Sequence, residues 1–175
     1  MQTKKQEDGF MPLYEGTENV LNEISVKPEV RESVVQGTDA VVAAIADAFS
    51  VTEHANIALD GWYGVEFEKI AGWIGKELEK RGIEAQLLPA AHYALPADKM
   101  AEYKKTFVTD DPSFGWVNDS GTISDVMDPG KVSELKKELA SRKQATLVYG
   151  YGSAVEELYS EYDKVFYFDK TQQPM

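Results

Sequence analysis

Residues 55–89 contain the feature that most constrains the fold: a strand, a glycine-containing turn, a helix and a second strand in direct succession. The apolar run 55–60 has the length of a buried strand, and the glycines of the segment 61–64 end it. Apolar residues then recur at helical spacing through 67–78, and a second apolar run follows at 83–89. Strands that are joined through a helix pair in parallel, so this segment predicts an α/β fold.

Helices and strands continue to alternate through the rest of the chain. The spacing of apolar residues predicts a helix over 38–49, with Thr38 as its N-cap, and another over 131–141. Apolar runs predict further strands at 145–148 and 164–169. The fold class that follows is α/β, with three layers and a mainly parallel sheet.

The chain divides by composition into a lead-in and a domain. Residues 1–37 mix charges and glycines with scattered apolar residues, which predicts an N-terminal arm and one short helix. Residues 38–175 carry the periodic segments and form the predicted α/β domain. Within it, the polar stretch 109–129 predicts a long loop, and a loop of this length in a compact domain is more often functional than idle.

The charge of the chain limits its partners. The formal net charge is −12 and the isoelectric point is near 4.6, so the negative potential around the chain disfavours nucleic acids and anionic membranes. We find no long uncharged apolar run and no signal peptide, which predicts a cytoplasmic protein. There is no cysteine, and His54 and His92 lack a partner at ligand spacing, so we expect no metal site.

Several segments occur in the order found in a known class of enzymes. The strand that ends in Ile-Ala-Leu-Asp-Gly and the helix 67–81 are followed by the acidic segment 110–115, by the Asp-Pro pair at 128–129 and by the two later strands. In this order the chain resembles nucleoside kinases of the uridine kinase type over 38–169, which implies a P-loop kinase-like fold. It also resembles the kinase-like N-terminal region that precedes a cupin domain in some bacterial mannose-6-phosphate isomerase proteins. That second resemblance implies a role in carbohydrate metabolism.

The phosphate-binding loop that the first resemblance implies is degenerate. A P-loop has the pattern G-x-x-x-x-G-K-[ST], in which amides cradle the phosphates, the lysine reaches their oxygens and the hydroxyl binds magnesium. Gly61 takes the place of the first glycine. Glu66, Phe67 and Glu68 then stand at the second glycine, the lysine and the hydroxyl. The strand 145–148 also lacks the acid that would help to hold the metal, so we expect neither a nucleotide cofactor nor kinase activity by this domain alone.

Ligands of open α/β sheets bind at the carboxyl ends of the strands, which selects a set of candidate residues for a small neutral ligand. The predicted cleft consists of Asp60, Gly61, Trp62, Tyr63, Gly64, Trp116 and Gly150. Asp110 and Asp111 are catalytic candidates only if the domain is an active phosphotransferase, because adjacent acids in a loop are otherwise turn formers. The segment 150–153 has two interpretations, an anion-binding nest or a helix start in which Ser153 forms a capping box with Glu156.

Three functions remain open. The first is a non-catalytic, kinase-derived domain that binds or regulates, within a larger sugar-phosphate isomerase-type protein. The second is an active nucleoside or sugar phosphotransferase with an atypical phosphate loop. The third is an oligomerisation module. The aromatic strand 164–169 fits either self-association or packing against a following cupin-like domain.

Overall fold

The computed structural model describes residues 26–111 and 113–170. The chain divides into two units, residues 1–35 and 36–175. In the first unit, the described residues form one short helix, α1 (Pro28–Glu32). The helices and strands that carry the candidate site belong to the second unit.

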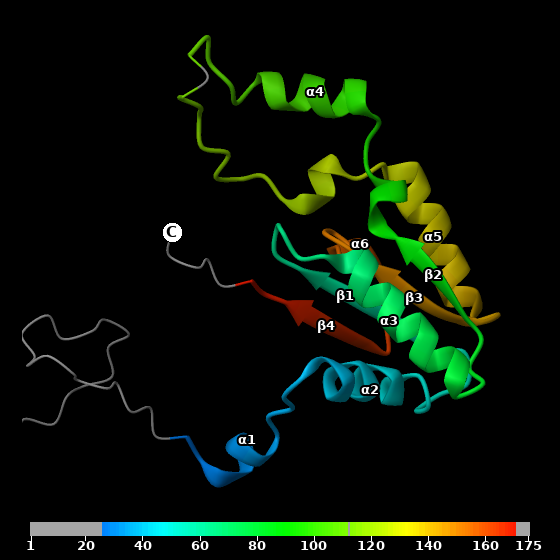
Figure 1. The fold of residues 1–175 in the computed structure, drawn as a ribbon. Coiled ribbons are helices and arrows are strands. Elements are labelled where there is room, and N and C mark those ends of the chain that lie inside the picture. Colours follow the sequence, from blue (N-terminus) through cyan, green and yellow to red (C-terminus); the bar gives the residue numbers. More distant parts are fainter. Residues whose placement is uncertain (1–25, 112, 171–175) are drawn as a thin grey trace, which may run out of the picture. The chain divides into compact units, whose positions relative to one another are not determined.

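The described part of the second unit is built on one four-stranded sheet. Its strands are β1 (Asn56–Gly61), β2 (Ala85–Pro89), β3 (Ala145–Tyr149) and β4 (Lys164–Phe168). They lie in the order β2-β3-β1-β4 and each neighbouring pair is parallel, so the predicted parallel sheet is confirmed (Figure 1). β1 and β3 form the centre of the sheet and are almost completely buried.

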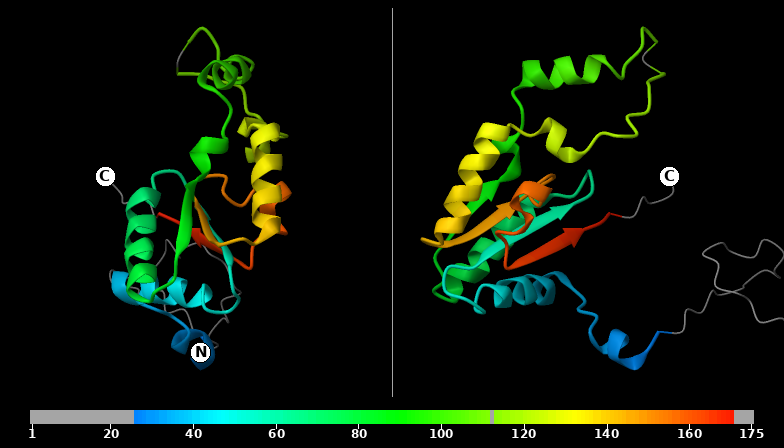
Figure 2. Two further views of the ribbon diagram at one scale, coloured as in Figure 1. Left: turned by 90° about the vertical axis from the view of Figure 1, so that its right-hand side faces the viewer. Right: turned by 180° about the vertical axis from the view of Figure 1, so that it is seen from behind.

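Helices cover both faces of the sheet, which confirms the predicted three layers (Figure 2, left). One face carries α2 (Thr38–Ala48) and α3 (Phe67–Lys80), and the other carries α5 (Pro129–Ser141) and α6 (Glu156–Tyr159). Successive side chains of a strand point to opposite faces. Leu147 of β3 therefore joins the core beside α2 and α3, whereas Val148 joins the core beside α5 and α6.

The connections leave the centre of the sheet in opposite directions. From β1 the chain runs through α3 on one face to β2, and from β3 it runs through α6 on the other face to β4. Crossovers between parallel strands are right-handed, so connections that run in opposite directions across a sheet lie on opposite faces. The carboxyl ends of β1 and β3 therefore flank the point where the connections diverge, which is where open α/β sheets bind ligands.

Between β2 and α5 the chain makes a long excursion, residues 95–126 (Figure 1). The 3-10 helix η1 (Ala90–Tyr93) leads to it, and it contains α4 (Ala97–Lys105) and the 3-10 helix η2 (Ile123–Val126). Two backbone hydrogen bonds close its base, from the amide of Leu95 to the carbonyl of Val126 (2.9 Å) and from the amide of Asp128 to the carbonyl of Tyr93 (2.8 Å). The two ends of the excursion therefore lie side by side where it joins the rest of the unit.

Two local expectations are wrong. Gly37 is the N-cap of α2, with a φ of 91°, and Thr38 is the first helical residue. The predicted helix start at Ser153 is absent, because α6 begins at Glu156 and no side chain caps it. The buried hydroxyl of Ser153 instead donates to the carbonyl of Leu59 (2.9 Å), so it is not free to cap a helix.

β1 and β4 approach too closely at Gly61 for any side chain. Gly61 lies opposite Phe168 in the register, and a Cβ at Gly61 would collide with the carbonyl oxygen of Phe168. The amide of Trp62 donates to that same oxygen (2.8 Å). The packing of β4 on β1 therefore requires glycine at this position.

We expect Gly61→Ala to lower the free energy of unfolding by about 2–3 kcal/mol, because β4 must move to admit the methyl group. Gly72→Ala is the matched control. Nothing lies within 4 Å of a Cβ at Gly72 in α3, so alanine there should stabilise the domain by about 1 kcal/mol. Urea denaturation of the two variants and the parent protein measures these differences, and equal stability of the two variants would contradict the steric argument.

Candidate functional site

A cavity of about 670 Å³ lies between the carboxyl ends of the central strands and the excursion. Its inner wall comes from the turn after β1, the first turn of α3 and the residues at the ends of β2 and β3. Its outer wall comes from α4 and the loop 118–126. The residues that line it include Tyr63, Phe67, Glu68, Met100, Tyr103, Lys104, Asn118, Tyr149, Gly150 and Tyr151.

The inner wall contains a hydrogen bond between β3 and α3. The hydroxyl of Tyr149, the last residue of β3, donates to Oε2 of Glu68 in the first turn of α3 (2.8 Å). Burial and the adjacent Glu68 carboxylate raise the pKa of the Tyr149 phenol to about 12. The hydroxyl therefore keeps its proton at neutral pH and remains a donor to Glu68.

Glu66 and Phe67 complete the start of α3. The half-buried ring of Phe67 packs edge-on against the ring of Phe168, with centroids 6.2 Å apart. Glu66 occupies the N-cap position, and its carboxylate pairs with Lys69 at 3.6 Å. A helix N-terminus normally favours an anion. Here the carboxylates of Glu66 and Glu68 already supply negative charge at that place.

Asp60 fixes the loop after β3. Its carboxylate accepts hydrogen bonds from the amides of Gly61 (2.7 Å), Gly152 (3.3 Å) and Ala154 (2.8 Å). Gly152 has a φ of 84°, a conformation that glycine adopts without strain. Part of the predicted anion nest thus binds an anion of the chain itself, the Asp60 carboxylate.

Two further hydrogen bonds hold the same loop. Besides the bond from Ser153 to the carbonyl of Leu59, the hydroxyl of Tyr162 donates to the carbonyl of Ser153 (2.7 Å). Burial and the negative charge of Asp60 raise the pKa of Tyr162, so its hydroxyl stays protonated. The loop beside the cavity is therefore fixed both from β1 and from the segment that precedes β4.

The outer wall has hydrogen bonds of its own. The Tyr103 hydroxyl accepts from the side-chain amide of Asn118 (2.7 Å) and donates to Oδ2 of Asp125 (3.4 Å). The ring of Tyr103 also packs against that of Phe107, with centroids 5.4 Å apart. Asp125 forms the capping box of η2 with Thr122. These contacts join α4 to the loop that returns to the sheet.

The structure brings two of the predicted cleft residues, Tyr63 and Gly150, into the lining of the cavity. Tyr63 is 87% exposed, and Gly150 follows directly after β3. Asp60 and Gly61 lie nearby at the end of β1, but their contacts are with the backbone of the domain. A role for all four in ligand binding stays a prediction.

Three other predicted cleft residues lie outside this cavity. Trp62 and Trp116 are 54% and 70% exposed and do not line it. Gly64 borders a separate hollow of about 230 Å³, and its carbonyl accepts a hydrogen bond from Nζ of Lys170 (3.3 Å). Neither Trp62 nor Trp116 lines that hollow, and the part of all three residues in ligand binding stays a prediction.

Asp110 and Asp111 lie in the loop after α4, and both are exposed. Oδ1 of Asp111 accepts from the amide of Ser113 (2.9 Å), and its carbonyl accepts from the amide of Phe114 (3.0 Å). Neither acid lines the cavity. In the described residues Asp111 acts as a turn former, which is one of the two interpretations that the sequence left open. The catalytic interpretation stays a prediction.

Sequence reasoning assigned none of Met100, Tyr103 and Asn118 to the cleft. They line the cavity because the excursion folds back towards the strand ends, and no local pattern encodes that arrangement. Tyr149 and Tyr151 are different, since they flank Gly150 at the end of a strand. The rule that selected Gly150 would also have selected these two tyrosines.

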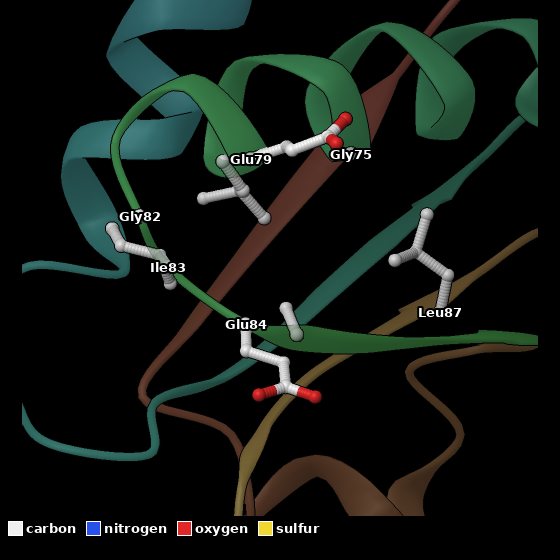
Figure 3. Close-up of a pocket in the computed structure, with 8 residues that line it drawn as sticks. Gly75, Glu79, Gly82, Ile83, Glu84 and Leu87 are labelled. Carbon is white, nitrogen blue, oxygen red and sulfur yellow. The ribbon is translucent and has the colours of Figure 1, made fainter.

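A second pocket, of about 390 Å³, lies beside the last turns of α3 and the start of β2 (Figure 3). Gly75 and Gly82 contribute no side chain to it, and Glu79 and Glu84 are its charged residues. Its other lining residues are apolar. Ligand sites usually combine apolar walls with several polar groups that fix orientation, so this pocket is the weaker candidate.

Residues 26–111 and 113–170 form neither a cluster of metal-ligating side chains nor a membrane-spanning helix. These ranges contain no group of three or more His, Asp or Glu side chains placed to hold a metal ion. Within the same ranges, each helix is too short or too polar to cross a membrane.

Comparison with solved structures defines the class of the fold. The chain is similar to a possible uridine kinase from Bacillus stearothermophilus, with a TM-score of 0.53 and 13% identity over 82% of this chain and 83% of that one. It is also similar to a candidate fructose transport system kinase from Silicibacter sp. TM1040, with a TM-score of 0.50 and 9% identity over 76% and 74% of the two chains. The fold is therefore that of a P-loop kinase-like α/β domain, as the sequence resemblance predicted.

The chain belongs to the family described as Domain of unknown function (DUF8485), whose model matches residues 37–175. No curated protein matches the chain. The resemblance to the region that precedes a cupin domain in isomerase proteins finds no support in these comparisons, and it stays a hypothesis.

We expect Asp60→Asn to lower the free energy of unfolding by about 1–3 kcal/mol, because one acceptor oxygen becomes a donor that faces backbone N–H groups. Asp110→Asn makes the same chemical change at an exposed position and should alter the stability by less than about 0.5 kcal/mol. Urea denaturation followed by circular dichroism compares the two variants. If both are as stable as the parent protein, the Asp60 carboxylate does not hold the loop.

Proposed function

We propose that this domain derives from a kinase and binds a ligand without transferring a phosphoryl group. The fold supports the kinase ancestry. The observation that carries the loss of catalysis is the hydrogen bond between Tyr149 and Glu68.

These two residues stand at the positions where a P-loop kinase holds magnesium. In P-loop enzymes, the metal is bound by a hydroxyl of the phosphate loop and by an acid at the end of a neighbouring strand. Glu68 replaces the hydroxyl, and Tyr149 ends the neighbouring strand β3. Because Tyr149 donates to Oε2 of Glu68, the pair offers a single carboxylate, one oxygen of which already accepts a hydrogen bond, where magnesium would need several oxygen ligands.

An apolar residue that packs inside the domain replaces the phosphate-binding lysine. Phe67 stands at that position, and its ring packs against Phe168. The first turn of α3 carries the negative charge of Glu66 and Glu68, so a triphosphate would meet like charge. Phosphoryl transfer depends mainly on positioning and on electrostatic stabilisation of the transferred group. At the place where that stabilisation needs positive charge, the chain supplies the negative charge of Glu66 and Glu68.

We also propose, on the sequence resemblance alone, that the domain serves a larger sugar-phosphate isomerase-type protein. A cupin-like domain or a second copy of this chain would be its partner. The cavity of about 670 Å³ would then supply the ligand site of that assembly.

We expect no binding of ATP or GTP at concentrations up to about 1 mM, with or without magnesium, because the first turn of α3 repels the phosphates. Isothermal titration calorimetry measures the binding, and a coupled assay for nucleotide hydrolysis measures turnover. Asp111→Asn and the matched loop variant Asp119→Asn are assayed together with the parent protein.

A magnesium-dependent affinity in the micromolar range would contradict the proposal. Turnover that Asp111→Asn abolishes and Asp119→Asn retains would favour the alternative, an active phosphotransferase with Asp111 as its base. Nucleotide turnover that both variants retain would also contradict a non-catalytic function. It would show in addition that Asp111 is not the catalytic base.

A further inference from the structure

The cavity contains one acidic group set among aromatic rings. Glu68 projects from the first turn of α3, is exposed and lines the cavity. Its Oε2 accepts the bond from Tyr149, and among the described residues no Lys or Arg pairs with it. Lys104 is the basic residue of the lining, and it belongs to α4 in the outer wall. The carboxylate of Glu68 is therefore a negative charge without a cation of its own.

Tyrosines from three positions share that lining. Tyr63 comes from the turn after β1, Tyr149 from the end of β3 and Tyr151 from the loop that follows. Tyr63 and Tyr151 are 87% and 59% exposed, so much of their ring surface remains open to a ligand. Aromatic faces carry negative electrostatic potential and attract cations, and they do so most strongly in a group.

From this arrangement we propose that the cavity binds an organic ammonium ion, held by the Glu68 carboxylate and by the rings of Tyr63 and Tyr151. The proposal rests on the proposed function, a domain that binds a ligand without transferring a phosphoryl group, and it names the chemical class of that ligand. It also replaces the small neutral ligand predicted from the sequence, because a neutral ligand would leave the Glu68 carboxylate without a cation.

The charge of the whole chain points the same way. With a net charge of −12, the protein concentrates cations near its surface and repels anions. The start of α3, where an anion would otherwise be favoured, already carries Glu66 and Glu68. Glu66 is paired with Lys69, whereas Glu68 faces the cavity, so Glu68 is the acid available to a ligand.

The test compares choline with 3,3-dimethyl-1-butanol, which has the same shape and no charge. Each is titrated into the isotopically labelled full chain, and backbone amide shifts are followed by NMR. We expect choline to shift the amides of residues 63, 68 and 149–151, and to bind at least about tenfold more tightly than the neutral alcohol.

Two pairs of variants locate the site. Glu68→Gln should weaken choline binding by at least about tenfold, because it removes the charge and keeps the shape. Glu79→Gln, at the other end of the same helix and outside the cavity, makes the same change in net charge and should leave the binding unaltered. Tyr63→Leu removes a ring that is 87% exposed and should weaken binding several-fold, whereas Tyr159→Leu, at a position 63% exposed and outside the cavity, should not.

Three results would overturn the proposal: no shift with choline up to about 50 mM, equal binding of choline and the alcohol, or equal effects of Glu68→Gln and Glu79→Gln. The second result would identify a neutral apolar site, and the third would identify general attraction by the acidic chain. None of these depends on nucleotide binding. A failure of this proposal is therefore distinguishable from a failure of the non-catalytic function, which only the nucleotide titration tests.

Discussion

The carboxylate of Asp60 is the interaction on which the arrangement of the site depends. Asp60 is the last residue but one of β1, and its carboxylate accepts hydrogen bonds from backbone amides of its own strand and of the loop after β3. Within that loop the amide of Ser153 donates to the carbonyl of Gly150 (3.0 Å), whereas the amides of Gly152 and Ala154 donate to Asp60 and would otherwise need other partners in a partly buried place. By supplying one acceptor for several donors, Asp60 fixes the position of the loop relative to β1. The inner wall of the cavity, from Tyr149 to Tyr151, is held in place as a consequence.

The side-chain charges in the same region are negative, whereas a phosphate-binding site presents positive potential. In a P-loop, the backbone amides and the helix dipole present positive potential to a polyanion. Here Asp60 takes up amides of the loop after β3, and Glu66 and Glu68 offset the dipole of α3. The fold is kinase-like, whereas the side chains at the start of α3 are negatively charged. Few residues are enough for such a difference in charge, because the potential at a helix N-terminus is set within its first turn.

The sequence predicted the sheet and its main helices because their apolar residues repeat with a clear period, as in α3 from Phe67 to Leu78. It failed at Ser153, where the spacing to Glu156 matched a capping box but the hydroxyl is buried against Leu59. Such a pattern predicts a hydrogen bond between residues that are close in sequence. It cannot show that a group distant in sequence, here the carbonyl of Leu59, binds the same hydroxyl instead. The cavity was predictable only in part for the same reason. Residues at strand ends can be inferred from topology, whereas Met100 reaches the cavity through the path of a long, aperiodic segment.

The paired ends of the excursion bear on how the length of this segment can vary. Leu95 and Val126, which bound the excursion, are joined by a backbone hydrogen bond of 2.9 Å. A segment whose ends already meet can be lengthened, shortened or exchanged with little entropic penalty and without moving the elements that flank it. The outer wall of the cavity therefore lies on a segment whose length can change without a change in the sheet. Relatives that differed only within this segment would keep the inner wall of Glu68 and the tyrosines and would differ in the size of the cavity.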